Sequence, residues 1–271
     1  GTAHTVEVGA QQSLLALDFD SATDARFRAA VTSLPVAPLL LHVTADAPVR
    51  AQMEEALQRD HALGAAFTDE AGAARYSLKV QGKTLGLIQR ESGLLIQSAP
   101  LDPSQPGRAA EALRPAIKRV AQWERLLALR NRASDIDAAS IDFVCSEPAE
   151  GGAKFVHPSN EVTLESVQQR DGQWSEIKAK LEVRNRSGRT LHILLAYFSP
   201  AYGVQVLRND PIESGEAWVT LYGDDPSHAF RLVEGHETEE TIDRFQLIAS
   251  TERVDGFLLE QEDLELGAAV S

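Results

Sequence analysis

The side chains best suited to covalent or metal chemistry in this 271-residue sequence are one cysteine and seven histidines. A cysteine nucleophile needs a histidine base beside it and hydrogen-bond donors for an oxyanion. Cys145 instead ends the apolar run 141–145, with no glycine-rich segment next to it and no histidine at a characteristic spacing. The histidines form neither H-x-x-x-H nor H-E-x-x-H, the spacings typical of a catalytic zinc site. We therefore expect Cys145 to be a buried structural thiol and expect no metal site.

Other catalytic patterns are also missing. The sequence contains neither the glycine-rich phosphate-binding loops nor the G-x-S-x-G turn of serine hydrolases. Acidic clusters at 224–225 and 237–240 could attract calcium, but they do not have the alternating ligands and central glycine of an EF-hand loop. We interpret them as solvated turns. These patterns predict no cofactor and no recognisable catalytic site. The remaining alternative is an enzyme whose active site follows none of these patterns.

Charge divides the sequence into two unlike halves. The formal net charge is −14, and residues 134–271 hold 26 Asp and Glu against 11 Lys and Arg. Such acidity argues against an unassisted nucleic-acid binder and against binding to an anionic membrane. No apolar run approaches the roughly 18 to 20 residues of a membrane span, and the first ten residues do not resemble a signal peptide, so we expect a cytoplasmic protein. The asymmetry is either ordinary variation for solubility or a sign that the acidic half faces a basic partner, in this chain or outside it.

Residues 1–106 are predicted to form a small mixed α/β domain. Alternating apolar residues and turn signals predict strands at 16–19, 39–43, 75–80, 84–89 and 94–97. Helical spacing predicts helices at 23–34 and 46–61.

A long amphipathic helix is expected to link the two halves over residues 107–133. Its apolar stripe recurs every three or four residues and comprises Leu113, Ile117, Val120, Trp123 and Leu127. The opposite face is basic and carries Arg114, Lys118, Arg119 and Arg125, followed by Arg130 and Arg132. We interpret this basic face as solvated or as resting on the acidic half. Contact of this face with nucleic acid is the least favoured interpretation.

Residues 134–271 are predicted to form an acidic antiparallel β-sandwich, Ig-like or similar, which makes the whole chain an α+β protein. Strands are expected at 140–145, 162–168, 174–184, 190–198, 204–207, 217–222, 228–233 and 241–250. Strict alternation in 177–184 and 191–197 predicts strands that are buried on one face and wet on the other. The turn 185–188 is expected to join these two strands as a hairpin. Candidate contact residues in this half are Trp174, Trp218, Asp224 and Asp225.

Two segments resemble the region that follows the peptidase domain in many bacterial caspase-like proteins. Residues 120–131, VAQWERLLALRN, are similar to the helix pattern I-x-x-W-x-x-x-L-x-L-x-N. Residues 243–252, DRFQLIASTE, together with LLEQ at 258–261, are similar to the closing strand F-K-L-I-x-S-T-E … L-L-E-Q. The resemblance covers roughly residues 120–265, whereas residues 1–110 agree only in general layout.

This sequence departs from the caspase-like pattern at the catalytic residues. It has neither the His-Gly histidine nor a cysteine in a setting like Q-A-C-x-G, and Cys145 follows the helix that comes after the peptidase domain. The resemblance therefore implies a non-catalytic C-terminal part, present as a fragment or released by proteolytic processing. It also implies a protein partner, either the peptidase domain or its substrate, and a regulatory or recognition role.

One further hypothesis comes from a different class of function. A free-standing β-sandwich that binds a carbohydrate or peptide would use exposed aromatic residues as its contacts. Its candidates are Trp174, Trp218, Tyr202 and Tyr222.

Overall fold

The computed structural model describes residues 3–8, 13–17, 37–59, 63–131, 134–148, 154–157, 159, 161–165, 177–223 and 242–269. The chain forms two compact units, Gly1–Ala37 with Arg130–Asp135, and Pro38–Leu129 with Ile136–Ser271. In the first unit, β1 (Ala3–Val8) and β2 (Ser13–Leu17) pair as an antiparallel hairpin. The helix expected at 23–34 lies outside the described residues.

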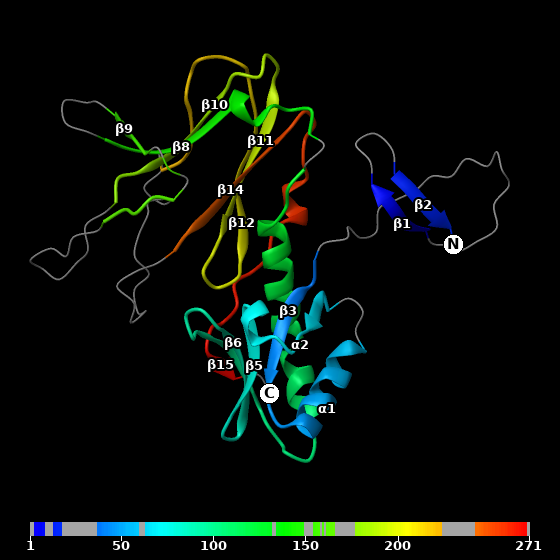
Figure 1. Cartoon of the computed structure of the whole chain (residues 1–271). Helices are drawn as coiled ribbons and strands as arrows, with labels where there is room; N and C mark the ends of the chain where they lie inside the picture. Colours follow the sequence, from blue (N-terminus) through cyan, green and yellow to red (C-terminus); the bar gives the residue numbers. More distant parts are fainter. Residues whose placement is uncertain are drawn as a thin grey trace, which may run out of the picture. The chain divides into compact units, whose positions relative to one another are not determined.

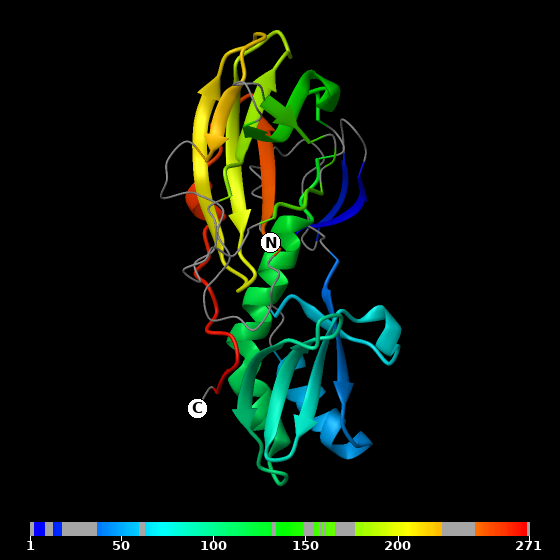
Figure 2. The ribbon, with the colours of Figure 1, turned by 90° about the vertical axis from the view of Figure 1, so that its left-hand side faces the viewer.

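The second unit begins with a mixed six-stranded sheet and two helices (Figure 1). The sheet order is β15-β7-β6-β5-β3-β4. Its strands are β3 (Leu39–Thr44), β4 (Ala65–Phe67), β5 (Tyr76–Gln81), β6 (Thr84–Gln89), β7 (Leu95–Pro100) and β15 (Ala268–Ala269). The helices α1 (Ala47–Gln58) and α2 (Pro106–Leu127) lie against the same face of this sheet (Figure 2). In the described residues, no helix is both long enough and apolar enough to cross a membrane.

The apolar stripe predicted for α2 is buried against this sheet. Leu113, Ile117 and Val120 are fully buried, together with Met53 and Leu57 of α1. The helix ends at Leu127, earlier than the expected residue 133, because a hydrogen bond from Leu129 N to Leu126 O (3.1 Å) closes a tighter last turn. A periodic apolar pattern thus correctly predicted the buried face of α2 but placed its end too late.

The remainder of the second unit is built on two antiparallel sheets. One has the order β13-β10-β8-β9 and the other β12-β11-β14. Their strands are β8 (Ile141–Pro148), β9 (Lys154–Val156), β10 (Lys180–Asn185), β11 (Leu191–Phe198), β12 (Val204–Ile212), β13 (Val219–Tyr222) and β14 (Arg244–Ser250). Inward-facing side chains from both sheets, including Leu181, Val183, Ile193 and Leu195, form one hydrophobic cluster. The mixed α and β class expected from the sequence is confirmed.

The expected hairpin between 177–184 and 191–197 is wrong. β10 pairs with β8 and β13, whereas β11 pairs with β12 and β14, so the turn after β10 crosses from one sheet to the other. Asn185 is only 1% exposed and holds this crossing, because its Nδ2 donates to the carbonyl oxygens of Arg189 (2.9 Å) and Ile212 (2.8 Å). Two strands that face each other across a core show the same alternation as two hairpin neighbours, so the pattern alone could not distinguish them.

Other expected strands have mixed outcomes. In the described residues 177–184 of the segment expected at 174–184, the strand begins at Lys180, and residues 162–165 are not a strand. The strand expected at 228–233 lies outside the described residues. The short strands β4, β9 and β15 were not expected, because two or three residues are too few to show alternation.

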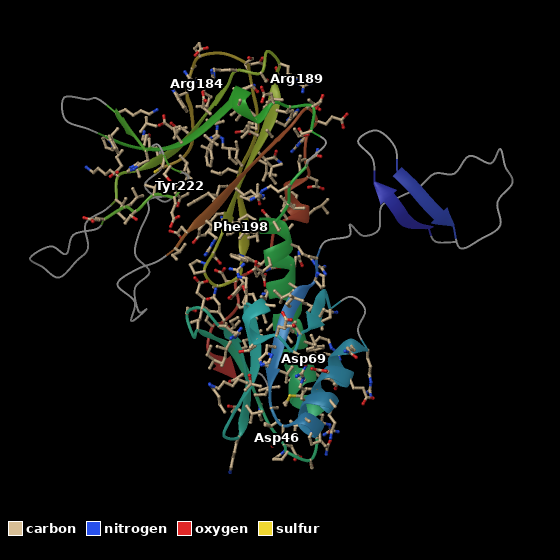
Figure 3. All side chains as sticks on the ribbon, viewed as in Figure 1. Asp46, Asp69, Arg184, Arg189, Phe198 and Tyr222 are labelled. Atoms are coloured by element: carbon tan, nitrogen blue, oxygen red, sulfur yellow. The ribbon has the colours of Figure 1, made fainter. Side chains whose placement is uncertain are left out.

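Trp123 of α2 joins the helix to the three-stranded sheet. Its ring is 4% exposed and packs edge-on against Phe198 (centroids 5.8 Å apart) and Tyr202 (5.4 Å). Figure 3 shows Phe198 at the end of the β-rich region that adjoins α2. Leu194, Ala196, Phe198, Tyr202 and Val204 belong to the same hydrophobic cluster as the core of the six-stranded sheet. One continuous core therefore runs from that sheet through α2 into β11 and β12.

The C-terminal segment runs from β14 back to the six-stranded sheet. It bridges Val204 at Gln261, donates from Leu264 N to Ala201 O (2.8 Å) and from Gly267 N to Ile96 O (2.9 Å), and then adds β15 in parallel to β7. This segment ties the β-rich part to the α/β part by backbone hydrogen bonds.

Replacing Trp123 tests the continuous core. We expect Trp123→Ala to lower the free energy of unfolding by about 3–5 kcal/mol, because the substitution leaves a large cavity between α2 and β11. Urea unfolding followed by circular dichroism measures this change. The matched control Phe257→Ala removes an exposed ring and should change stability by less than about 0.5 kcal/mol. An equally small effect at Trp123 would contradict a continuous core through the contact of Trp123 with Phe198 and Tyr202, which we call the joint.

Candidate interaction surfaces

Cys145 lies on β8 with its side chain partly buried in the hydrophobic cluster between the two antiparallel sheets. Burial, and then the Glu147 and Glu182 carboxylates, raises the pKa of its thiol to about 11. The register of β8 and β9 places His157 opposite Cys145, and His157 N donates to Cys145 O (2.9 Å). The imidazole Nε2 nevertheless lies 2.6 Å from Glu147 Oε1, so the ring is engaged by that carboxylate. This pairing was not predictable from the sequence, because β9 is only three residues long.

The thiol pKa gives a direct test by alkylation. Because only the thiolate reacts, iodoacetamide should modify native Cys145 much more slowly at pH 8.5 than the urea-unfolded chain, whose thiol pKa is about 8.5. The reaction rate of the native protein should rise toward pH 11. By linkage, the protonated thiol adds stability below about pH 8.5, and this contribution is lost as pH rises toward 11. Half-maximal native reactivity at or below pH 8.5 would contradict the buried-thiol interpretation.

Two arginines of the predicted basic face of α2 contact different elements, namely α1 and the C-terminal segment. Arg114 Nη2 donates to Ala56 O of α1 (2.9 Å), and Arg119 Nη1 donates to the carbonyl oxygens of Glu262 (3.1 Å) and Asp263 (3.2 Å). The Arg125 guanidinium packs directly over Gly64, where a side chain would overlap it. Lys118 also interacts with other residues of this chain. Arg114 and Arg119 therefore bind backbone carbonyls of their own chain, and these cations do not form one open patch.

Glu124 has a role that the sequence did not suggest. The Tyr76 hydroxyl donates a hydrogen bond to Glu124 Oε1 (2.6 Å), and Arg75 Nη1 donates to Glu124 Oε2 (2.8 Å). Burial, then the neighbouring Tyr202 and Glu124, raises the pKa of the Tyr76 hydroxyl well above its usual value, so it stays protonated and donates. The acidic residue of the Trp-Glu-Arg motif thus anchors β5 to α2 beside Trp123.

Trp218 lies on the outer face of the sheet β13-β10-β8-β9. Lys154 Nζ lies 4.5 Å from its ring centroid and Arg184 Cζ 4.7 Å, so two cations contact one indole ring. Arg184 also pairs with Asp142 (2.7 Å) and Glu216 (3.1 Å). Figure 3 shows Arg184 in this upper, β-rich region.

Beneath this cation–ring group lies an almost buried carboxylate. Glu182 is 8% exposed, and its Oε2 accepts a hydrogen bond from the Ser146 hydroxyl and pairs with Lys154 Nζ (2.7 Å). An ionised carboxylate that is withdrawn from water requires such partners. Lys154 on the short strand β9 therefore forms both the ion pair with Glu182 and the cation–π contact with Trp218.

Removing Lys154 tests this arrangement. We expect Lys154→Ala to lower the free energy of unfolding by about 1–3 kcal/mol, because Glu182 keeps its burial but loses its countercharge. Adding Glu182→Gln should restore part of the loss, which a double-mutant cycle in urea measures. Lys79→Ala, at an exposed lysine of β5, is the matched control with an expected change below about 0.5 kcal/mol. No coupling between Lys154 and Glu182 would contradict the interpretation.

Among the described residues, the most exposed large apolar side chains belong to a short turn in the C-terminal segment. Phe257 is 83% exposed and Leu258 76%, on the 3-10 turn Gly256–Leu258. Two hydrogen bonds fix the backbone of this turn. Within the turn, Asp255 Oδ1 accepts from Phe257 N (3.2 Å), and from β12, Asn209 Nδ2 donates to Val254 O (2.9 Å). Among the described residues this turn, which we call the Phe257 turn (255–259), combines high apolar exposure with a fixed backbone.

The structure does not gather the predicted contact residues into one site. Trp123 is buried in the joint, Trp218 lies on the outer sheet face, and Trp174, Asp224 and Asp225 lie outside the described residues. Across the described part of the chain, no group of three or more His, Cys, Asp or Glu side chains could hold a metal ion. The Phe257 turn was not predicted, because apolar residues in a strand-rich region are typical of core residues.

Comparison with family models, with curated proteins and with solved structures finds no match to this chain.

Proposed function

We propose that this chain is a non-catalytic interaction module of a bacterial caspase-like cysteine peptidase, which binds the peptidase domain. The observation that carries the proposal is that the two segments resembling those proteins meet around Trp123. They are separated by more than a hundred residues in the sequence, and they form a single joint.

Several contacts make up this meeting point. Gln261 Nε2 donates to Arg119 O (3.2 Å) and to Tyr202 O, so the L-L-E-Q segment is held at the helix. Arg244 Cζ lies 5.6 Å from the Trp123 ring centroid, and Gln246 Nε2 donates to Leu129 O (3.2 Å). Residues of both motifs thus build one structural unit, which supports a resemblance of fold in this region.

The β-rich part supplies the recognition surface in this proposal. Its two antiparallel sheets share one hydrophobic cluster, as the layers of a β-sandwich do, and we propose that they form one. Its excess of acidic residues suits a basic partner. Caspase-like enzymes of bacteria and plants often cut after Arg or Lys, which fits such a role, and a cytoplasmic location belongs to the same proposal.

The described aromatic residues do not favour the alternative of a carbohydrate-binding or peptide-binding protein. Tyr202 is buried in the joint, Tyr222 packs against Phe245 (5.5 Å), and Trp218 is contacted by two cations. A stacked ligand needs an open ring face, and these rings are engaged by their own chain.

The proposal is tested by binding and by activity. The caspase-like peptidase domain encoded with this chain should associate with it in isothermal titration calorimetry, and the complex should weaken as salt is added because the β-rich part is acidic. Cys145→Ala in the complete protein should leave proteolysis intact. Absence of binding at about 100 μM of each protein would contradict the proposal. Substrate turnover by this chain alone, abolished by one polar substitution, would also contradict it.

A further inference from the structure

The Phe257 turn exposes two neighbouring apolar side chains to an unusual degree. Phe257 and Leu258 are 83% and 76% exposed, whereas the next most exposed large apolar side chain in the described residues, Ile242, is 57% exposed. Single exposed apolar residues are ordinary on protein surfaces, but a contiguous pair that projects from a fixed turn is typical of an interaction site.

The turn is anchored on both sides of the exposed pair. Gly256 is buried against Val206 and Asn209 of β12, where any side chain would be crowded. Leu259 is partly buried in the continuous core, and its N donates to Gly256 O (2.9 Å). Because the backbone is already fixed, binding through Phe257 and Leu258 would cost little ordering entropy.

Acidic side chains surround the apolar pair in the sequence. Residues 251–265 carry one arginine and six exposed acidic residues, namely Glu252, Asp255, Glu260, Glu262, Asp263 and Glu265. An apolar pair flanked in the sequence by an excess of acidic side chains is complementary to an apolar pocket bordered by Lys and Arg. A second copy of this chain, at a net charge of −14, would instead be repelled, and so would an anionic membrane.

From this exposure, anchoring and charge we infer that the Phe257 turn is a docking site, and that its occupant is a protein surface with an apolar pocket bordered by lysine and arginine. This inference rests on the proposed function, which identifies that surface with the peptidase domain. Phe257 and Leu258 enter the pocket, and Glu252 and Glu260 pair with the basic rim.

The test uses titration of the peptidase domain into variants of the full chain. Phe257→Ser and Leu258→Ser, singly and together, should leave unfolding unchanged, and the double variant should weaken binding by about 30-fold or more. Phe155→Ser, at a 54% exposed ring on β9, is the matched apolar control and should bind as the wild type does. The double variant Glu252→Lys with Glu260→Lys should weaken binding and should also reduce the effect of salt on binding. The matched control Glu91→Lys, at an exposed acidic residue after β6, should change neither.

The outcomes separate the inference from the proposed function. If the wild type binds the peptidase domain and the Phe257 and Leu258 variants bind equally well, the docking site is wrong and the proposed function stands. If the wild type does not bind, both are overturned. Sedimentation that shows the chain dimerising through Phe257 and Leu258, or binding of the wild type but not the double variant to phosphatidylcholine vesicles, would also overturn the inference.

Discussion

The burial of one indole ring joins the α/β part to the β-rich part within the second unit. Trp123 of α2 lies between the six-stranded sheet and β11, where it meets Phe198 and Tyr202 edge-on. Aromatic pairs of this geometry add specificity to a large buried area. Glu124, the next residue, fixes Tyr76 on β5, so the same short stretch of helix contacts both layers. The α/β part and the β-rich part therefore share a core, although their compositions differ.

The C-terminal segment completes this joint and at the same time carries the exposed surface. Gln261 is bound to Arg119 O and Tyr202 O, and β15 adds to the edge of the six-stranded sheet. The Phe257 turn lies between β14 and these anchors, so its apolar side chains project from a fixed backbone. In this account, the residues that stabilise the fold and the residues that contact a partner alternate along one segment.

The sequence predicted features that depend on local periodicity. The apolar stripe of α2 and the inward face of β10 were visible, because each side chain's face follows from its position in a helix or strand. The wet face expected for 191–197 is wrong, because Leu194 and Ala196 on that face of β11 are buried in the continuous core. The sheet crossing at Asn185 was not predictable, since it depends on an amide that reaches Arg189 O and Ile212 O. The contacts of Glu124 and Lys154 depend on residues far away in sequence. The exposure of Phe257 was hidden because an apolar residue in a β-rich region is ordinarily read as core.

The most direct test of the central claim, that a rigid joint presents the Phe257 turn to a peptidase domain, is hydrogen–deuterium exchange of the chain with and without that domain. The account predicts that amides in residues 254–260 gain protection on binding, whereas those around Trp123 and in β11 are already slow and do not change. New protection confined to the sheet β13-β10-β8-β9, with residues 254–260 unaffected, would contradict it.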